Sequence, residues 1–242
     1  MNPRSLACVL LVFFSCREEA PLNRNWSAYG GSPENTRYAD LSEIDTGNVH
    51  LLQPAWEYHT GDADTVNHSQ IQCNPLVIDG IMYGTTPLMK LFALDAVTGK
   101  EKWTFNPFDS LGEDMRSFFI MNNCRGVSYW SDGRGDRRIF YTAGSNLYAI
   151  DAGSGLPVKG FGQDGKVDLH EGLGRDVSQL FVTATSPGAV FKDLIIMGTR
   201  VDEGPAAAPG HIRAFDVRSG KLAWIFHTIP QPGEPGHETW DN

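Results

Sequence analysis

A short pattern occurs three times along the chain, and this repeat constrains the fold more than any other feature of the sequence. Each copy reads Ala, an apolar residue, Asp, and then Gly four residues after the Asp. The copies span residues 93–99, 149–155 and 214–220. They recur at intervals of about 60 residues, the size of a four-stranded β-propeller blade with a variable loop. The repeat therefore predicts one supersecondary unit used several times.

The chemistry of the motif is that of a strand entering a tight turn. Its Asp can accept hydrogen bonds from the backbone of the turn, and its Gly supplies the positive φ that reverses the chain. Trp103 and Trp224 follow four residues after the Gly of the first and third copies, where a flat ring can wedge between blades. Lys159 takes this place in the second copy, with Phe161 two residues later. We therefore predict a weaker or displaced docking contact there.

The segments before each repeat supply the remaining strands of a blade. Residues 75–83 read as two strands joined at an Asp-Gly hairpin turn, and 125–130 with 138–142 and 188–191 with 194–197 fill the same positions. Residues 26–61 add one strand around Trp56. The prediction is an all-β partial propeller of about three blades. Closed propellers need roughly four to eight blades, so the sequence looks truncated, with exposed strand edges.

Composition agrees with this fold and excludes several functions. A content of 41% hydrophobic residues with 26 Gly and 14 Pro favours a buried core built from many short strands and turns. The net charge is -9 and the Lys and Arg residues are scattered, which argues against nucleic acid as a partner. Gly30-Gly31 precedes no strand-to-helix unit, so a nicotinamide dinucleotide site is not expected.

The first residues read as a targeting segment. Arg4 precedes an apolar run at 6–14, and Ser15-Cys16 follows; the run is too short to span a bilayer. A small residue followed by Cys resembles a bacterial lipoprotein signal, which would place a lipid on Cys16. Ordinary secretion and an uncleaved anchor remain alternatives. We expect a leader at 1–16, a linker at 17–25, a propeller portion at 26–242, and a periplasmic location with or without membrane attachment.

Two cysteines, Cys73 and Cys124, lie in the part expected to fold. In an oxidising compartment they could pair. Two buried thiols are an equal alternative, and their spacing is not that of a metal site.

Several segments together resemble the opening of the pyrroloquinoline-quinone (PQQ)-dependent, or quinoprotein, dehydrogenases: 26–31, 37–38, 48–49 and 55–62. The three repeats resemble that family's tryptophan-docking motifs. The resemblance implies eight blades around a funnel, in which the quinone lies over the axis beside a calcium ion. The carboxylates of the quinone need Arg and hydroxyl donors. Calcium needs hard oxygen ligands and polarises the carbonyl that accepts hydride.

Carried over residue by residue, the resemblance implies a set of cofactor contacts. Gln72 would lie at the edge of the quinone, Arg125 would bind it, and Thr185 would offer it a hydroxyl. A strand-end cap, a surface Arg and a turn Thr are the respective structural alternatives. Arg200 is a weaker candidate for a cofactor carboxylate.

The metal site would be acidic. Glu203, five residues after Gly198, resembles the family's acidic calcium ligand, and Asp202 lies beside it. Sugar-oxidising members have an Asp-Asn pair here, so either residue could hold the metal. A solvated acidic loop is the alternative.

Two departures from the family pattern shape the functional expectation. Asn123 precedes Cys124, so the adjacent-cysteine disulfide of the alcohol-oxidising branch cannot form. This favours a sugar or polyol, as in glucose dehydrogenases, with electrons passing to a membrane quinone or cytochrome c. The family's catalytic Asp comes from later blades, so it is expected beyond residue 242 and the chain alone should lack turnover. The rival is a non-catalytic scaffold lipoprotein of the outer-membrane assembly type, which would have no need of the polar rim residues.

Overall fold

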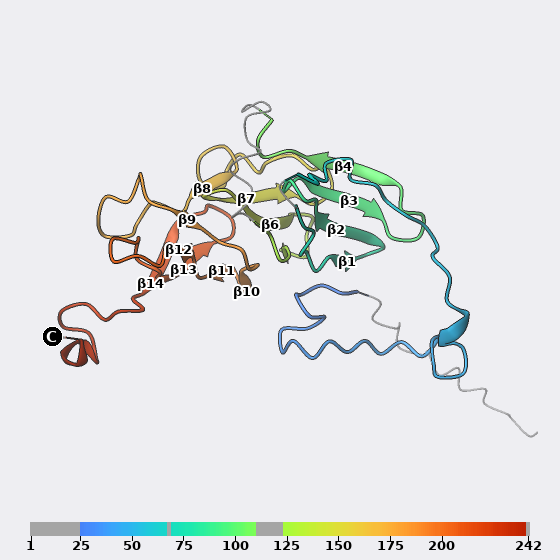
Figure 1. Ribbon diagram of the computed structural model, residues 1–242, viewed down its shortest axis with the longest axis horizontal. Helices are drawn as coiled ribbons and strands as arrows, with labels where there is room; N and C mark the ends of the chain where they lie inside the picture. The colour runs from blue at the N-terminus through green and yellow to red at the C-terminus, as the bar shows by residue number, and fades with distance from the viewer. Residues whose placement is uncertain (1–24, 67–68, 110–122, 241–242) are drawn as a thin grey trace, which may run out of the picture.

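The strands form three consecutive blades in the computed structural model, which describes residues 25–66, 69–109 and 123–240. The predicted leader, Cys16 and most of the linker lie outside these residues. Within them there are three four-stranded antiparallel sheets and one two-stranded sheet (Figure 1). The prediction of an all-β partial propeller with about three blades is confirmed. No helix in the described ranges is long and apolar enough to cross a membrane.

Each blade is built from strands in chain order, innermost first. The first contains β1 (Leu76–Ile78), β2 (Ile81–Thr85), β3 (Leu91–Asp95) and β4 (Glu101–Phe105). The second contains β5 (Ser128–Ser131), β6 (Arg137–Ala143), β7 (Asn146–Asp151) and β8 (Lys166–Asp168). The third contains β10 (Ala189–Phe191), β11 (Leu194–Met197), β13 (Ile212–Asp216) and β14 (Leu222–Phe226).

The remaining elements are short. β9 (Val182–Thr183) pairs with β12 (Arg200–Val201), and the described residues also form two 3-10 helices, η1 (Val49–Leu51) and η3 (His237–Thr239). The predicted Asp-Gly hairpin joins β1 to β2. Asp79 and Gly80 have φ values of 50° and 76°, as a two-residue type I′ turn requires.

The three repeated motifs form three equivalent turns. In the first, Asp95 Oδ1 accepts hydrogen bonds from the Thr98 amide at 2.9 Å and from the Thr98 hydroxyl at 2.8 Å. Asp151 and Asp216 bind Ser154 and Ser219 in the same way. The glycines that follow have φ between 69° and 74°, which glycine adopts without steric cost.

Two tryptophans dock on these turns. Trp103 Nε1 donates to the Ala152 carbonyl at 3.2 Å, and its ring covers Gly155, where an added Cβ would lie 2.6 Å from a ring carbon. Trp56 Nε1 donates to the Ala96 carbonyl at 3.1 Å. However, the predicted strand around Trp56 is wrong, because residues 52–60 form no strand. A strand needs a neighbour for its backbone hydrogen bonds, and no strand in the described ranges pairs with this segment.

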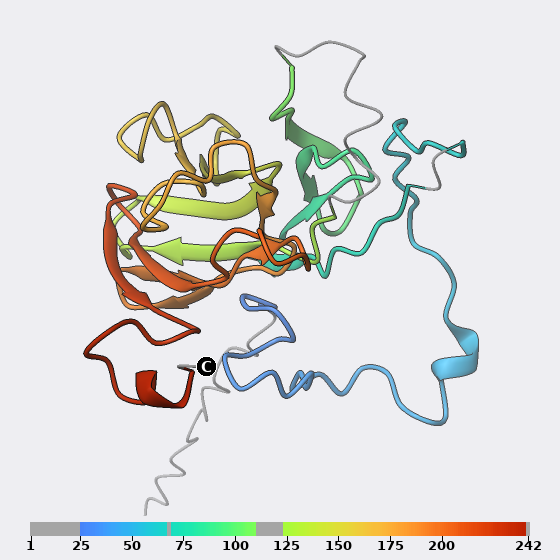
Figure 2. The ribbon, with the colours of Figure 1, turned by 60° about the vertical axis from the view of Figure 1, so that its left-hand side comes forward.

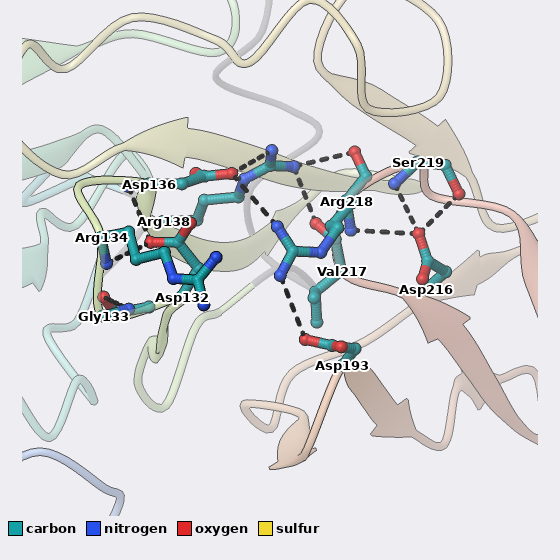
Figure 3. A network of polar contacts seen from close by, with 11 residues as sticks. Asp132, Gly133, Arg134, Asp136, Arg138, Asp193, Asp216, Val217, Arg218 and Ser219 are labelled. Carbon is teal, nitrogen blue, oxygen red and sulfur yellow. Dashed lines mark hydrogen bonds and ion pairs between the residues drawn. The ribbon is translucent and has the colours of Figure 1, made fainter.

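The joint between the second and third blades is displaced, as the sequence predicted. The Val217 carbonyl occupies the place of Ala96 and Ala152 in the motif, and it accepts a hydrogen bond from Arg138 Nη1 at 2.8 Å (Figure 3). The Gly162 amide adds a bond to the Ser219 carbonyl at 2.9 Å. Lys159 is exposed, whereas Phe161 is fully buried. An arginine on β6 therefore takes the role that Trp103 of the last strand has in the first blade.

The core lies between the blades. One cluster joins the first and second blades and includes Leu76, Leu91, Ile139 and Tyr141. The other joins the second and third blades. The blades are thus fixed relative to one another by apolar packing, and the positions at the ends of their inner strands are set by that packing.

Candidate functional site

The approaches to the three inner strands lie side by side at one end of the blades. The Asn74 amide donates to the Arg125 carbonyl at 2.8 Å, and the Arg125 amide donates to the Thr185 carbonyl at 2.8 Å. Asn74 and Gly126 also form a parallel bridge. Backbone hydrogen bonds thus link Arg125 and Thr185 directly, and Gln72 lies two residues before the bridged Asn74.

Arg125 has the environment expected of an anion-binding side chain. It is exposed, and its guanidinium forms no hydrogen bond or ion pair with any residue in the described part of the chain. It lines a cavity of about 390 Å³. The other residues of that lining come from the N-terminal segment and from the inner strands of the second and third blades: Ala28, Tyr29, Ser32, Pro33, Asn35, Ser128, Tyr129, Ser186, Pro187, Gly188, Ala189 and Val190.

This arrangement fits one carboxylate of a planar, multiply charged ligand. A guanidinium without an internal partner can form a bidentate bond to a carboxylate. The apolar and aromatic members of the lining could contact a flat ring. The chemistry of the cavity is therefore compatible with a quinone tricarboxylate at its Arg125 end.

The structure gives less support to Gln72 and Thr185 as cofactor contacts. Gln72 is half-buried and donates from Nε2 to Gln70 Oε1 at 2.8 Å, so it has a local partner. Thr185 is half-buried, and its hydroxyl bonds to no other residue among those described. Both positions are near Arg125 in the backbone ladder, and their contact with a cofactor stays a prediction.

The acidic pair directly follows β12. The β9–β12 register pairs Arg200 with Thr183. Arg200 lies 5.9 Å from the Phe181 ring. The structure therefore joins Arg125 to Thr185 by a backbone hydrogen bond, whereas the place of Arg200, Asp202 and Glu203 in the same site stays a prediction.

The acidic loop supplies only part of a calcium site. Asp202 and Glu203 are both exposed, and Asp202 Oδ1 accepts the Glu203 amide at 2.8 Å. Across the described ranges, no group of three or more His, Cys, Asp or Glu side chains is arranged to hold a metal ion. Calcium takes six to eight oxygen ligands. These two carboxylates would have to be completed by other groups.

The cysteine thiols beside the site are shielded. Burial raises the pKa of Cys124 to about 12 and also raises that of Cys73. Both are therefore protonated at neutral pH and are poor nucleophiles.

One buried acidic residue was missed by the sequence reasoning. Asp62 is 9% exposed, and its Oδ2 accepts the Thr86 hydroxyl at 2.6 Å, whereas its Oδ1 has no partner among the described residues. Thr86 belongs to the turn between β2 and β3. The only signal in the sequence was its place at the end of segment 55–62, which resembles the opening of a family.

Comparison with known proteins places these observations in context. Residues 26–242 match the family model described as "PQQ: Glucose/ethanol/alcohol dehydrogenase, beta-propeller domain". Similar curated proteins include quinoprotein glucose dehydrogenase A of Acinetobacter calcoaceticus, 34% identical over 84% of this chain and 28% of that protein. Another is quinate/shikimate dehydrogenase (quinone) of Acinetobacter baylyi, 30% identical over 88% of this chain and 28% of that protein.

A solved structure of a quinohemoprotein is also similar to this chain. The quinohemoprotein alcohol dehydrogenase from Comamonas testosteroni has a TM-score of 0.65 and 27% identity, over 90% of this chain and 29% of that one. The chain thus spans less than a third of the length of these relatives.

Proposed function

The chain belongs to the β-propeller family of PQQ-type glucose, ethanol and alcohol dehydrogenases, and from this we propose that it contributes one side of the cofactor funnel of a PQQ-dependent dehydrogenase. The observation that carries the proposal is Arg125, a guanidinium without a partner in the described part, facing a cavity beside the ends of three adjacent inner strands. A non-catalytic scaffold would have no use for this arrangement.

The residues have separate roles in the proposal. Arg125 holds a carboxylate of the cofactor, Thr185 offers it a hydroxyl, and Gln72 contacts its edge, with Arg200 a secondary carboxylate ligand. Asp202 and Glu203 supply carboxylate oxygens to calcium. The chemistry that bound PQQ and calcium supply is hydride acceptance at a polarised quinone carbonyl. The side chains of this chain bind and orient, and the base that removes the substrate proton is proposed to lie beyond residue 242.

The substrate and cellular setting follow from two sequence features. Asn123 before Cys124 leaves no adjacent-cysteine pair, so we assign a sugar or polyol substrate of the kind that glucose dehydrogenases oxidise. The electrons would pass to a membrane quinone or cytochrome c. The segment 1–16 would direct the protein to the periplasm, with a lipid anchor at Cys16.

Direct binding of PQQ tests the proposal. We expect the calcium-supplemented chain to bind PQQ, as monitored by quenching of tryptophan fluorescence, and Arg125→Ala to weaken that binding by about 2 kcal/mol, roughly 30-fold in Kd. Arg134→Ala, in an exposed turn of the second blade, is the matched control and should bind normally. Failure of the unaltered chain to bind PQQ would favour the scaffold function instead.

A further inference from the structure

Two histidines face each other where residues 228–240 leave the third blade. His211 directly precedes β13, and His227 directly follows β14. The strand register pairs Ile212 with Phe226, so the two histidines are the next opposed residues. Their rings meet edge to face, with centroids 4.6 Å apart and planes at 78°. The pair therefore lies at the open end of the β13–β14 hairpin, at the base of the segment 228–240.

His227 also contacts the segment that follows it. Its Nδ1 lies 2.7 Å from Glu234 Oε1, and Glu234 Oε2 accepts the Gln231 amide at 2.7 Å. The Gln231 amide and His227, in that order, lower the pKa of Glu234, so a carboxylate accepts the hydrogen of Nδ1. Figures 1 and 2 show the segment after β14, in red, outside the three sheets. Contacts at its base therefore fix its direction relative to the third blade.

His211 is buried and lacks a partner at one ring nitrogen. The residue is 7% exposed, and its Nδ1 forms no hydrogen bond with any described residue. Alternate residues of a strand share a face, so Arg213 lies on the same side of β13 as His211. Arg213 is fully buried, and its guanidinium donates to the carbonyls of Leu169 and Glu171, which bring no negative charge. A proton on His211 would therefore place a second buried cation beside the first.

The groups around His211 favour its neutral form. Burial has the largest effect and lowers the pKa of His211, His227 and Arg213 lower it further, and Glu234 opposes them. A histidine whose folded pKa is lowered stabilises the folded arrangement at pH values above its unfolded pKa of about 6.5. That contribution is lost as the pH falls from there through the folded pKa. The contact between His211 and His227 should therefore weaken in mild acid.

We propose that His211, His227 and Glu234 form an acid-sensitive latch, which fixes residues 228–240 to the third blade while His211 is neutral and releases them when it is protonated. A protonated imidazole needs a hydrogen-bond acceptor at each nitrogen, and the buried Nδ1 has none, so the ring must turn outward. His227, which packs against that ring and bonds to Glu234, is then displaced together with the segment. The inference rests on these side-chain contacts alone and does not depend on PQQ binding.

The segment can move as a unit. Its turns are closed internally, because the Glu234 amide donates to the Gln231 carbonyl at 2.9 Å and the Trp240 amide donates to the His237 carbonyl at 3.0 Å. The Thr228 hydroxyl also reaches back to the Gly210 carbonyl, at 3.4 Å. That bond is long and therefore weak, so we expect the histidine pair to decide the position of the segment.

Hydrogen exchange of the full chain tests the latch. Peptides covering 228–240 are followed by mass spectrometry at pH 7.5 and pH 5.5, with rates corrected for the intrinsic effect of pH. We expect corrected exchange to be about fivefold faster at pH 5.5 in wild type. His211→Phe keeps an aromatic ring but does not titrate, so its corrected rates should be equal at the two pH values. His50→Phe, at an exposed site, is the matched control and should behave as wild type.

Two results of this experiment would overturn the proposal. One is equal corrected rates in wild type at the two pH values, and the other is an unchanged pH effect in His211→Phe. His211→Gln, which is smaller and also does not titrate, replaces His211→Phe if the larger ring disturbs the fold.

The titration of His211 gives a readout that needs no variant. Ring resonances of the isotope-labelled chain, followed by NMR from about pH 8 to pH 5, should give a midpoint below about 6.5 for His211. The acceleration of exchange in 228–240 should begin near pH 6.5 and level off below that midpoint. A midpoint for His211 above 6.5, or an acceleration that continues unchanged below it, would count against the latch.

Discussion

At the residue scale, the turn aspartates are the features whose role follows most directly from chemistry. Asp95 accepts hydrogen bonds from the side chain and amide of Thr98 and from the amide of Val97. These bonds lower the pKa of Asp95, the Thr98 side chain having the largest effect. A carboxyl whose pKa is lower in the folded state stabilises the fold above its unfolded pKa. That contribution is lost as the pH falls through its folded pKa.

Asp95→Asn should therefore flatten the acid limb of the stability curve. The amide oxygen can still accept the turn's hydrogen bonds but does not titrate, so the variant should lose less stability than wild type between about pH 5 and pH 2. Urea unfolding midpoints measured across this interval check the prediction. Asp40→Asn, at an exposed site, serves as the control. Parallel curves for wild type and Asp95→Asn would contradict it.

Arg138 is the second residue with a large expected effect. Its side chain is 9% exposed, pairs with Asp136 at 2.7 Å, and donates to the carbonyls of Val217 and Arg218 at 2.8 Å each. The guanidinium groups of Arg138 and Arg218 lie 5.6 and 4.5 Å from the centre of the Trp130 ring. Figure 3 shows the resulting network, which Arg218 extends to Asp193.

Removing this guanidinium should loosen the joint between the second and third blades. Arg138→Ala leaves two carbonyls and a carboxylate without their donor, so we expect a loss of about 3 kcal/mol in the free energy of unfolding. Chemical denaturation provides the measurement. Exposed Arg137→Ala is the matched neighbour and should cost less than about 0.5 kcal/mol. Similar losses of stability in both variants would show that the Arg138 network does not hold the second and third blades together.

At the element scale, the blades are joined at the turn between their last two strands. The joint between the first and second blades uses an indole over a glycine, and the joint between the second and third uses an arginine from β6. The indole of Trp56, in the N-terminal segment, docks on the turn of the first blade in the same way. All three place a donor on the carbonyl of the residue after the motif Asp. The hydrogen-bond acceptor is therefore always the carbonyl after the motif Asp, whereas the donor is a tryptophan or an arginine. The repeat in the sequence predicts only the position of the acceptor.

Gly155→Ala tests the joint that Trp103 makes between the first and second blades. The added Cβ would combine a positive φ of 74° with a 2.6 Å contact to the Trp103 ring, so we expect a loss of about 3 kcal/mol. Gly133 has a φ of 70° and open space around its Cα. Gly133→Ala should therefore show the backbone cost alone, about 1 to 2 kcal/mol. Equal losses measured by denaturation would mean that the ring contact contributes nothing.

At the scale of the whole molecule, the third blade has an uncovered apolar face. The ladder aligns Ala189, Ile196, Ala214 and Trp224 in one row across the sheet. Phe191, Ile212 and Phe226, at alternate positions of the same strands, are 60%, 37% and 61% exposed. β14 is the edge strand of this sheet, drawn in red in Figure 2. The same face of the first blade is covered by the second.

Such a face should promote self-association of the chain. Exposed contiguous apolar surface promotes self-association and binds hydrophobic dyes. The double change Trp224→Lys with Phe226→Lys should reduce both dye fluorescence and the apparent mass in sedimentation. Val97→Lys, at an isolated site that is 80% exposed, should change neither. Equal dye binding by the wild type, the double variant and Val97→Lys would show that the dye-binding surface is not this face of the third blade.

The sequence by itself determined the blades, because strand alternation, the Asp turn and the positive-φ glycine are local properties that recur with each repeat. It also predicted that Lys159 would not dock as a tryptophan. Only the tertiary structure decided what replaced it, since Arg138 is on another strand and reaches Val217 only when the blades pack. The tertiary structure also decided that Trp56 docks without a strand, that Asp62 is buried, and that a backbone hydrogen bond joins Arg125 to Thr185. Packing brings together side chains that are distant in the sequence, and no local sequence pattern predicts those contacts.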